Sequence, residues 1–320
     1  MDLFTHFMLP YFIMMALRRP QAERLAAGLG GWAPDFDTAL AWTTWVSDDL
    51  YFLGHRGLSH SLLGAPIFAF VVMGLVSIPY WRRLSPRMEV WRFTPRLVLI
   101  AMAASYTHLW FDWLTIWGIP AFYPWAVERV SLNWFFYSVN LAFLVSGYLV
   151  YRLARGTWND RVMWKGAAFF VAAFAISGAV RYATYPEDTG ADQIHPGNFE
   201  WRFTTYTYNE TLPGWEIGQY NLGKLQRTRA YNETIPENAT RDNVVATVKA
   251  SDEWWRWALY AYGPHVFQVE ERGDGSYNVT VLDLLRRSQT DDAPGWFPRI
   301  RDYGTLRVVV DGDDVRPRDA

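Results

Sequence analysis

The sequence contains no cysteine, and this absence excludes disulfide bonds and thiolate metal ligands. Any metal site in the protein must therefore use nitrogen and oxygen ligands. Net charge is also nearly absent, because 30 basic residues are set against 32 acidic ones and leave a formal charge of −2. Nucleic-acid-binding domains are typically basic on one surface, so we expect no nucleic-acid partner.

The chain also lacks the features of a signal peptide. Its first residues, Met1 to His6, contain neither a basic segment nor a small-residue cleavage site, and we expect them to belong to the mature protein. Apolar side chains, in contrast, are abundant and make up 51% of the residues. They are concentrated before about Tyr185, after which the chain becomes polar. This change predicts a membrane-embedded helical domain over residues 1–184, to which the histidine and aspartate motifs below assign a metal site, and a small β-rich soluble domain over residues 185–320.

Five apolar segments in the first part have the composition of membrane helices: Leu3–Leu17, Leu62–Tyr80, Leu97–Trp117, Leu132–Tyr151 and Gly166–Val180. A full crossing takes about 20 residues. The first segment is shorter than that, so we expect it to tilt or re-enter, and the sequence predicts about four to five membrane helices in contact with the lipid bilayer.

Two loops between these segments, at Arg82–Arg96 and Arg152–Lys165, are basic and are predicted to be cytoplasmic. The protein is therefore expected to be a multi-pass cell-membrane protein with its C-terminal domain outside.

The polar part shows the alternation of apolar and polar residues that is typical of strands. The predicted elements are a strand through Phe199, Trp201 and Phe203, a hairpin of 266–271 and 277–282, a strand at 306–310 and a short helix within Ser251–Tyr262.

His55 and His60 lie five residues apart, with Arg56 and Gly57 between them. Imidazole is the commonest protein metal ligand. If Ser59 caps the following helix, His60 lies on its first turn and a bend directs both rings toward one point. The alternative is a solvated loop before a membrane helix.

His108 and Asp112 are four residues apart inside an apolar segment, so on a helix they share one face and can bind one ion. The alternative is a structural pair in which the histidine is hydrogen-bonded to the aspartate.

Two further pairs have ligand spacing. Asp35 and Asp37 flank Phe36, and in an extended loop both carboxylates point to the same side. Asp2 and His6 have the same four-residue spacing as a helical pair. The alternatives are a solvated loop for the first pair and a frayed terminus for the second.

Together, four histidines and at least three aspartates exceed the ligand number of one tetrahedral zinc ion, which predicts a site of two or three ions. Arg56 is placed to bind an anionic, phosphate-like group with two parallel hydrogen bonds. A lipid-headgroup contact is the alternative for Arg56.

The order of these motifs, Asp2-x-x-x-His6, Pro34-Asp35-x-Asp37, His55-Arg56-Gly57-x-Ser59-His60-Ser61 and His108-x-x-x-Asp112, resembles the membrane-bound metal-dependent hydrolases, also known as LexA-binding, inner-membrane-associated hydrolases. The resemblance extends over roughly residues 1–150 and includes Asp112–Pro124. A weaker similarity in ligand types connects the chain to zinc-dependent phospholipases C and P1-type nucleases.

The resemblance implies a polytopic membrane protein with a divalent metal site whose ligands are His6, Asp35, Asp37, His55, His60, His108 and Asp112. Zinc is the preferred ion, with manganese or iron as alternatives. Relatives carry aspartate in the apolar segment that corresponds to Leu132–Tyr151. This chain has Asn133 and Asn140 there, seven residues apart and expected on one helix face. We assign both, with Arg56, to substrate binding.

These features predict an integral membrane hydrolase in which a metal-bound hydroxide attacks a phosphoester or similar bond of a lipid or envelope substrate. Arg56 and Asp37 are the expected catalytic residues. The alternative is a non-enzymatic, metal-stabilised scaffold or regulatory protein that binds an envelope protein partner. A transporter is a third possibility, and it is disfavoured because the apolar segments lack repeated pairs of broken helices.

Overall fold

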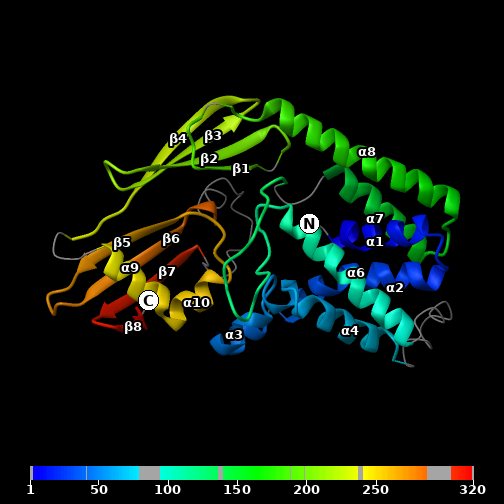
Figure 1. The fold of residues 1–320 in the computed structure, drawn as a ribbon, viewed down its shortest axis with the longest axis horizontal. Helices are drawn as coiled ribbons and strands as arrows, with labels where there is room; N and C mark the ends of the chain where they lie inside the picture. Colours follow the sequence, from blue (N-terminus) through cyan, green and yellow to red (C-terminus); the bar gives the residue numbers. More distant parts are fainter. Residues whose placement is uncertain are drawn as a thin grey trace. The chain divides into compact units, whose positions relative to one another are not determined.

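The computed structural model describes the chain apart from residues 1–2, 41, 79–93, 136–139, 188, 198, 237–240, 287–303 and 319–320. It divides into two compact units (Figure 1). The first comprises Met1–Thr184 with Pro196–Glu200, and the second comprises Tyr185–His195 with Trp201–Ala320. The helical N-terminal region and the β-sheet region that follows it agree with the prediction.

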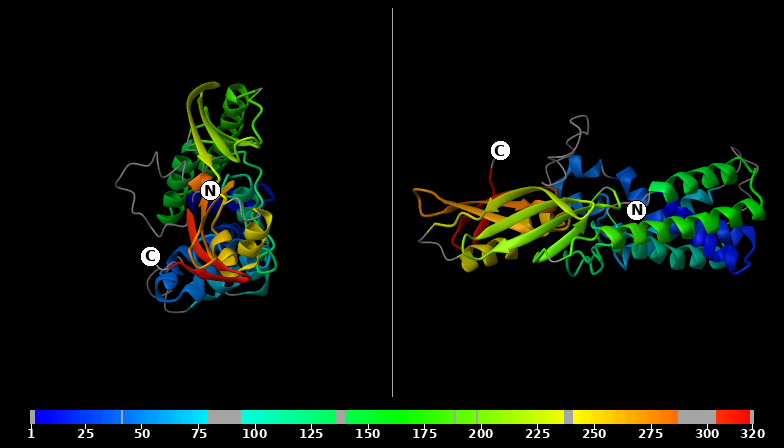
Figure 2. Two further views of the ribbon diagram at one scale, coloured as in Figure 1. Left: turned by 90° about the vertical axis from the view of Figure 1, so that its left-hand side faces the viewer. Right: turned by 90° about the horizontal axis from the view of Figure 1, so that it is seen from above.

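The first unit is helical, and its long helices pack side by side (Figures 1 and 2). Its α-helices are α1 (Leu3–Ala16), α2 (Gln21–Trp32), α3 (Thr43–Val46), α4 (Gly64–Val76), α6 (Pro95–Trp113), α7 (Asn140–Ala154) and α8 (Asp160–Thr184). Its 3₁₀ helices are η1 (Ala33–Leu40), η2 (Asp48–Leu53) and η3 (Leu58–His60). Helix α6 begins where sequence rules place a start, because the Thr94 hydroxyl accepts a hydrogen bond from the backbone N–H of Leu97 and Pro95 follows at the first helical position.

Helix α2 brings the other helices together through two adjacent glycines. A Cβ atom on Gly30 would lie 2.1 Å from the carbonyl oxygen of Ala101 in α6, and one on Gly31 would lie 2.3 Å from the carbonyl oxygen of His6 in α1. Each glycine costs about 1 kcal/mol of helix stability relative to alanine. In return the three backbones can approach closely enough for side chains of α1 and α6 to meet. The glycines and the proline of Gly28–Asp37 are typical of a loop, but the segment is helical: α2 extends to Trp32, and the 3₁₀ helix η1 begins at Ala33.

Within the described residues, α8 is the one helix long and apolar enough to cross a membrane. The apolar helices α1, α4 and Leu141–Ala154 are shorter. Helix α8 begins six residues before the predicted Gly166–Val180 segment and ends four residues after it. In the apolar segment predicted over Leu132–Tyr151, the described residues 132–135 are not helical, and helix α7 is described from Asn140.

The second unit contains two four-stranded sheets. The first sheet has the order β1 (Gln193–Pro196), β2 (Arg202–Asn209), β3 (Gly214–Asn221), β4 (Lys224–Asn232), and the second has the order β5 (His265–Glu271), β6 (Tyr277–Asp283), β7 (Thr305–Asp311), β8 (Asp314–Pro317). Helices α9 (Arg241–Ala250) and α10 (Asp252–Ala258) share a buried apolar core with the second sheet.

The predicted hairpin is confirmed as the antiparallel pair β5–β6, and the strand predicted at 306–310 is β7. The predicted aromatic helix is α10, which the Ser251 hydroxyl caps by accepting a hydrogen bond from the backbone N–H of Trp254. The strand predicted to include Phe199 and Trp201 is wrong at its start, because β2 begins at Arg202.

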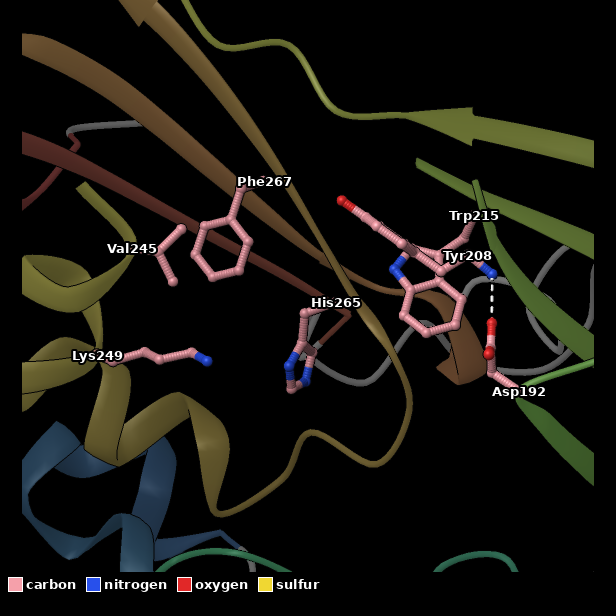
Figure 3. Close-up of a pocket in the computed structure, with 7 residues that line it drawn as sticks. All are labelled: Asp192, Tyr208, Trp215, Val245, Lys249, His265 and Phe267. Carbon is pink, nitrogen blue, oxygen red and sulfur yellow. Dashed lines mark hydrogen bonds between the residues drawn. The ribbon is translucent and has the colours of Figure 1, made fainter. Parts of the chain in front are cut away.

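A pocket of about 490 Å³ lies in the second unit (Figure 3). Tyr208 and Trp215, from the first sheet, and Phe267, from the second, form aromatic walls, and His265 and Lys249 contribute polar groups. The predicted site residues all lie in the first unit, so this pocket is separate from them.

Candidate metal centre

Six side chains from four helical elements meet in the first unit. They come from α1, η1, η3 and α6, and we call them the His/Asp centre: His6, Asp35, Asp37, His60, His108 and Asp112. Five of them are completely buried, and Asp35 is 8% exposed. A cluster of this kind inside a helical unit is energetically unfavourable unless its members are paired or bind an ion.

Two imidazoles in the centre face each other, with 3.0 Å between the Nε2 atoms of His60 and His108. The Nδ1 atom of His108 lies 2.9 Å from the carbonyl oxygen of Gly31. Because a carbonyl can only accept, the proton of a neutral His108 ring belongs on Nδ1 and its Nε2 atom carries a lone pair.

The same reasoning applies to His60. Its Nδ1 atom lies 3.2 Å from Oδ2 of Asp37 and 2.8 Å from Oγ of Ser59. The Ser59 hydroxyl donates its own hydrogen to Asp37, so Nδ1–H of His60 is the donor toward these oxygens. Two lone pairs then converge on one point, and such an arrangement needs a cation or a proton between them.

Two carboxylates complete the surroundings of this point. Oδ1 of Asp35 lies 3.6 Å from Nε2 of both histidines, and Oδ2 of Asp112 lies 3.5 Å from the same two atoms. Ligands bound to zinc at about 2.0–2.2 Å in a tetrahedron are separated by roughly 3.3–3.6 Å. The distances from either carboxylate to the two imidazoles therefore match two edges of one face of such a tetrahedron, and the third edge, between the two Nε2 atoms, is shorter at 3.0 Å.

His6 contacts two other members of the centre without forming a hydrogen bond to either. Its ring stacks on His108 with 3.6 Å between centroids, and its Nε2 atom lies 3.4 Å from Oδ1 of Asp112. Neither of its ring nitrogens forms a hydrogen bond within the described residues. A buried imidazole whose ring nitrogens form no hydrogen bond is costly, and a bound ion would relieve that cost.

Two groups of donor atoms are compact enough to hold a metal ion: His6, His108 and Asp112, and Asp35, His55 and His60. The donor set suits a divalent cation, because it contains neutral imidazoles and carboxylates. Buried His/Asp clusters of this first unit could thus hold one divalent ion or two.

Asp37 lies behind His60, on the Nδ1 side of its ring. Its carboxylate binds Nδ1 of His55 at 2.7 Å, the backbone N–H of Arg56 at 3.1 Å and the Ser59 hydroxyl. Burial alone would raise the pKa of Asp37, but His60 and His55 outweigh it and hold the pKa below its usual range. The contacts place Asp37 as the partner that orients His60, an outer position that commonly tunes metal ligands.

The arrangement of Asp35 and Asp37 differs from the expected extended loop. Both lie on the 3₁₀ helix η1, where three residues make one turn, so residues two apart point in different directions. Asp35 consequently approaches Nε2 of His60, whereas Asp37 approaches Nδ1.

Arg56 is buried, and its guanidinium is directed at the centre. Its Nη2 atom donates to Oδ1 of Asp112 at 3.0 Å, and its Nη1 atom lies 3.5 Å from the carbonyl oxygen of Gly118. The backbone of Arg56 is in the left-handed region, with φ at 69°. The guanidinium that was predicted to bind a substrate anion therefore binds a candidate metal ligand.

The structure adds one residue that sequence reasoning did not single out. Arg129 donates from Nε to the carbonyl oxygen of Trp117 at 2.8 Å, from Nη2 to that of Gly118 at 2.9 Å and from Nη1 to that of Arg56 at 3.1 Å. These hydrogen bonds connect the loop at Arg56 with the loop that contains Trp117 and Gly118. In the sequence Arg129 is one basic residue of a loop, and its backbone acceptors carry no side-chain pattern that would have identified its role.

Asn133 and Asn140 do not share a helix face, so that prediction is wrong. Asn133 precedes α7, has φ at 53° and accepts a hydrogen bond from the Ser131 hydroxyl at 2.9 Å. Backbone pairing between Thr115 and Phe135 holds this segment outside the helix. The side chain of Asn140 lies outside the described residues.

Ser59 does not cap a helix, because its hydroxyl is bound to Asp37. Helix α4 begins at Gly64, whose backbone N–H donates to the Ser61 hydroxyl at 2.9 Å. His60 therefore lies on η3 before the helix, and its neighbour His55 keeps 37% of its side chain exposed. Asp2 lies outside the described residues.

Comparison with protein families yields one match for the region that contains the centre. The sequence model described as YdjM inner membrane protein matches residues 1–184, which is more than half of the chain. No curated protein and no solved structure matches the chain.

Proposed function

The chain belongs to the YdjM inner membrane protein family, and we propose that its helical unit is a multi-pass membrane domain that holds a catalytic divalent metal ion. The observation that carries the proposal is the 3.0 Å distance between the Nε2 atoms of His60 and His108, because the partners at Nδ1 of each ring leave Nε2 without a proton in the neutral form. His60, His108, Asp112 and Asp35 are the proposed ligands, with His6 as a further donor. Zinc suits this nitrogen and oxygen set best, and manganese or iron are alternatives.

The proposed reaction is hydrolysis of a phosphoester or similar bond in a lipid or envelope substrate. A bound divalent ion polarises an ester oxygen and lowers the pKa of a coordinated water molecule. Asp37 holds the proton on Nδ1 of His60, and Arg56 holds Asp112 in place. His55 is the proposed proton-transfer group, because Asp37 binds its Nδ1 atom while the ring remains partly exposed.

A lipid substrate is favoured by the surface of the helical unit. Large aromatic side chains are exposed close in sequence to the centre: Trp42, Trp110, Phe122, Trp125 and Trp134. Tryptophan is enriched where a membrane meets water. We therefore propose that the centre lies near the membrane surface, where it can receive a headgroup.

The burial of the centre favours a second candidate function, a metal-stabilised scaffold or regulatory protein that binds an envelope partner. Five of the six centre residues are completely buried, and the Arg56 guanidinium is occupied by Asp112. A structural metal site is closed in this way, whereas a catalytic site keeps one coordination position open.

Metal analysis of the purified full chain, in wild type and in His60→Ala and His108→Ala, tests the metal site. We expect bound metal in the wild type, loss of metal in both variants and a lower melting temperature after chelation. Ligand binding at 100 times Kd contributes about 2.7 kcal/mol to folded-state stability. His195→Ala, which removes a buried histidine in the second unit, is the control. Equal metal content in all four proteins would falsify the site.

Turnover of phosphodiester and phospholipid substrates, with and without chelator, then separates the two functions. The enzyme proposal requires turnover that disappears with the metal. A metal-bound protein without turnover across a broad ester and phosphoester panel supports the scaffold instead.

A further inference from the structure

Arg181, near the C-terminal end of α8, is a buried cation outside the His/Asp centre. Its residue exposure is 5%, although α8 is the candidate membrane span. Its Nη2 atom lies 3.5 Å from the carbonyl oxygen of Gly197, and its Cζ atom lies 5.8 Å from the centre of the Phe135 ring. Within the described part of the chain, its Nε and Nη1 atoms are buried and have no hydrogen-bond partner.

A carboxylate is nearby but is held by other groups. Oε1 of Glu200 accepts a hydrogen bond from the Ser177 hydroxyl at 3.2 Å, one helical turn before Arg181 on the same face of α8. The backbone carbonyl of Glu200 accepts from the Thr184 hydroxyl at 3.4 Å. Among the described residues, no Arg181–Glu200 ion pair accompanies these contacts. A guanidinium buried with open donors is strongly unfavourable, so an acceptor is required at Nε and Nη1.

The surroundings indicate which acceptor. The adjacent Tyr182 is 86% exposed, and Trp134, whose Nε1 atom lies 3.9 Å from the Cβ position of Gly178, is 56% exposed. Exposed tyrosine and tryptophan at the end of a membrane helix are typical of the headgroup level. Phosphate is the abundant anion at that level, and arginine is the side chain that matches its oxygens best.

We propose that Arg181 binds a phosphate group at the C-terminal end of α8, either in a lipid headgroup or as a free anion. The open N–H groups at Nε and Nη1 donate to phosphate oxygens, while the Phe135 ring covers one face of the guanidinium. Glu200 accepts its hydrogen bond from Ser177 and, among the described residues, forms no ion pair with Arg181, so the N–H groups at Nε and Nη1 stay open for the phosphate. This phosphate site does not depend on the His/Asp centre. The metal content of the protein should therefore be the same whether or not Arg181 binds phosphate.

The test compares the full-length wild type with Arg181→Gln and with Arg152→Gln. Arg152 is a matched control, because it also lies near a helix end but its guanidinium already donates to Thr157 and to the Tyr148 hydroxyl. Melting temperature is measured in neutral detergent against inorganic phosphate, and in nanodiscs of phosphatidylglycerol or of an uncharged glycolipid. Metal content is recorded for each protein.

We expect phosphate or phosphatidylglycerol to raise the melting temperature of the wild type and of Arg152→Gln, and to leave Arg181→Gln unchanged. A rise with inorganic phosphate identifies a site for the free anion, and a rise with phosphatidylglycerol alone identifies a headgroup site. No rise in either arm, or an undiminished rise in Arg181→Gln, overturns the proposal.

Two further variants keep the test decisive if Arg181→Gln does not fold. Arg181→Lys keeps the charge but loses the planar fork, so its response should be weaker than that of the wild type. Glu200→Gln tests whether Glu200, instead of a phosphate group, is the acceptor for Arg181. If Glu200→Gln removes the stabilisation provided by Arg181 in a double-mutant cycle, Glu200 is the acceptor and the phosphate proposal is wrong.

Discussion

His60 and Asp37 form a close pair in which Oδ2 of the carboxylate lies 3.2 Å from Nδ1 of the ring, opposite the Nε2 atom that faces His108. The pair fixes which nitrogen carries the proton. It also explains why a second aspartate so close to Asp35 in sequence does not have to be a ligand, since the two carboxylates approach different nitrogens of the same ring.

Asp37→Asn should weaken metal binding without removing it. Loss of an outer carboxylate that orients a ligating histidine typically lowers metal affinity 10- to 100-fold. Asp35→Asn, which alters a proposed ligand, should have the larger effect. Competition with a chelator of known affinity measures both variants. Equal losses would mean that Asp37 is a direct ligand, as the sequence originally suggested.

Arg56→Lys should lower metal affinity and stability together. The Arg56 guanidinium donates to buried Asp112, and a hydrogen bond to a charged group contributes about 1.5–3 kcal/mol. Lysine cannot reach Asp112 and the Gly118 carbonyl with the same planar group. Chemical unfolding and metal titration of the variant measure the two effects. If the variant keeps its metal affinity but shows a raised KM for a phosphoester, Arg56 binds the substrate anion, as predicted from the sequence.

The histidine and aspartate motifs were predictable from sequence because each pair has a spacing that local geometry converts into proximity. His108 and Asp112 share a helix face by periodicity alone. What sequence could not provide was the set of long-range contacts. Gly30 and Gly31 allow α2 to approach α6 and α1, and nothing in the pattern of apolar residues marks these two glycines as contact points.

Backbone-directed contacts were also beyond sequence reasoning. Arg129 donates hydrogen bonds to three backbone carbonyl oxygens. Every residue has a backbone carbonyl, so the residue types in the sequence do not identify these partners. The Asn133 prediction failed for a related reason. Helical spacing suggested a shared face with Asn140, but pairing of Phe135 with Thr115 keeps the segment out of the helix.

His195 should make the folded state less stable as the pH falls. Burial lowers its pKa from 6.5 to about 4, so between these values the unfolded chain binds a proton that the folded chain does not. Stability is therefore complete above about pH 6.5 and decreases toward pH 4, by at most about 3 kcal/mol at 1.36 kcal/mol per pKa unit. Denaturant unfolding between pH 4 and 7 measures the slope.

His195→Gln should reduce this pH dependence. His265, whose pKa burial also lowers, will leave a residual slope of the same sign. A variant with the full wild-type slope would show that His195 does not titrate in this range.

The proposed topology follows from the connection between α7 and α8. The two helices are joined by residues 155–159, and basic side chains lie in this turn, at Arg155, and on both sides of it, at Arg152 and Arg161. Positively charged loops are retained in the cytoplasm. If α7 enters and α8 leaves the membrane, the two crossings return the chain to the side from which it started, so the His/Asp centre and the second unit lie on the same, external side.

Single cysteines test this topology without background, because the chain contains no cysteine of its own. Thr157→Cys lies in the turn between α7 and α8, and Thr211→Cys lies in the turn between β2 and β3, where both native residues are exposed. In sealed spheroplasts, an impermeant thiol reagent should label position 211 and should reach position 157 only after permeabilisation. Labelling at 157 alone would invert the orientation and place the centre in the cytoplasm. Equal labelling at both positions in sealed spheroplasts would mean that α8 does not separate them, and α8 would then be a packed helix of the first unit instead of a membrane span.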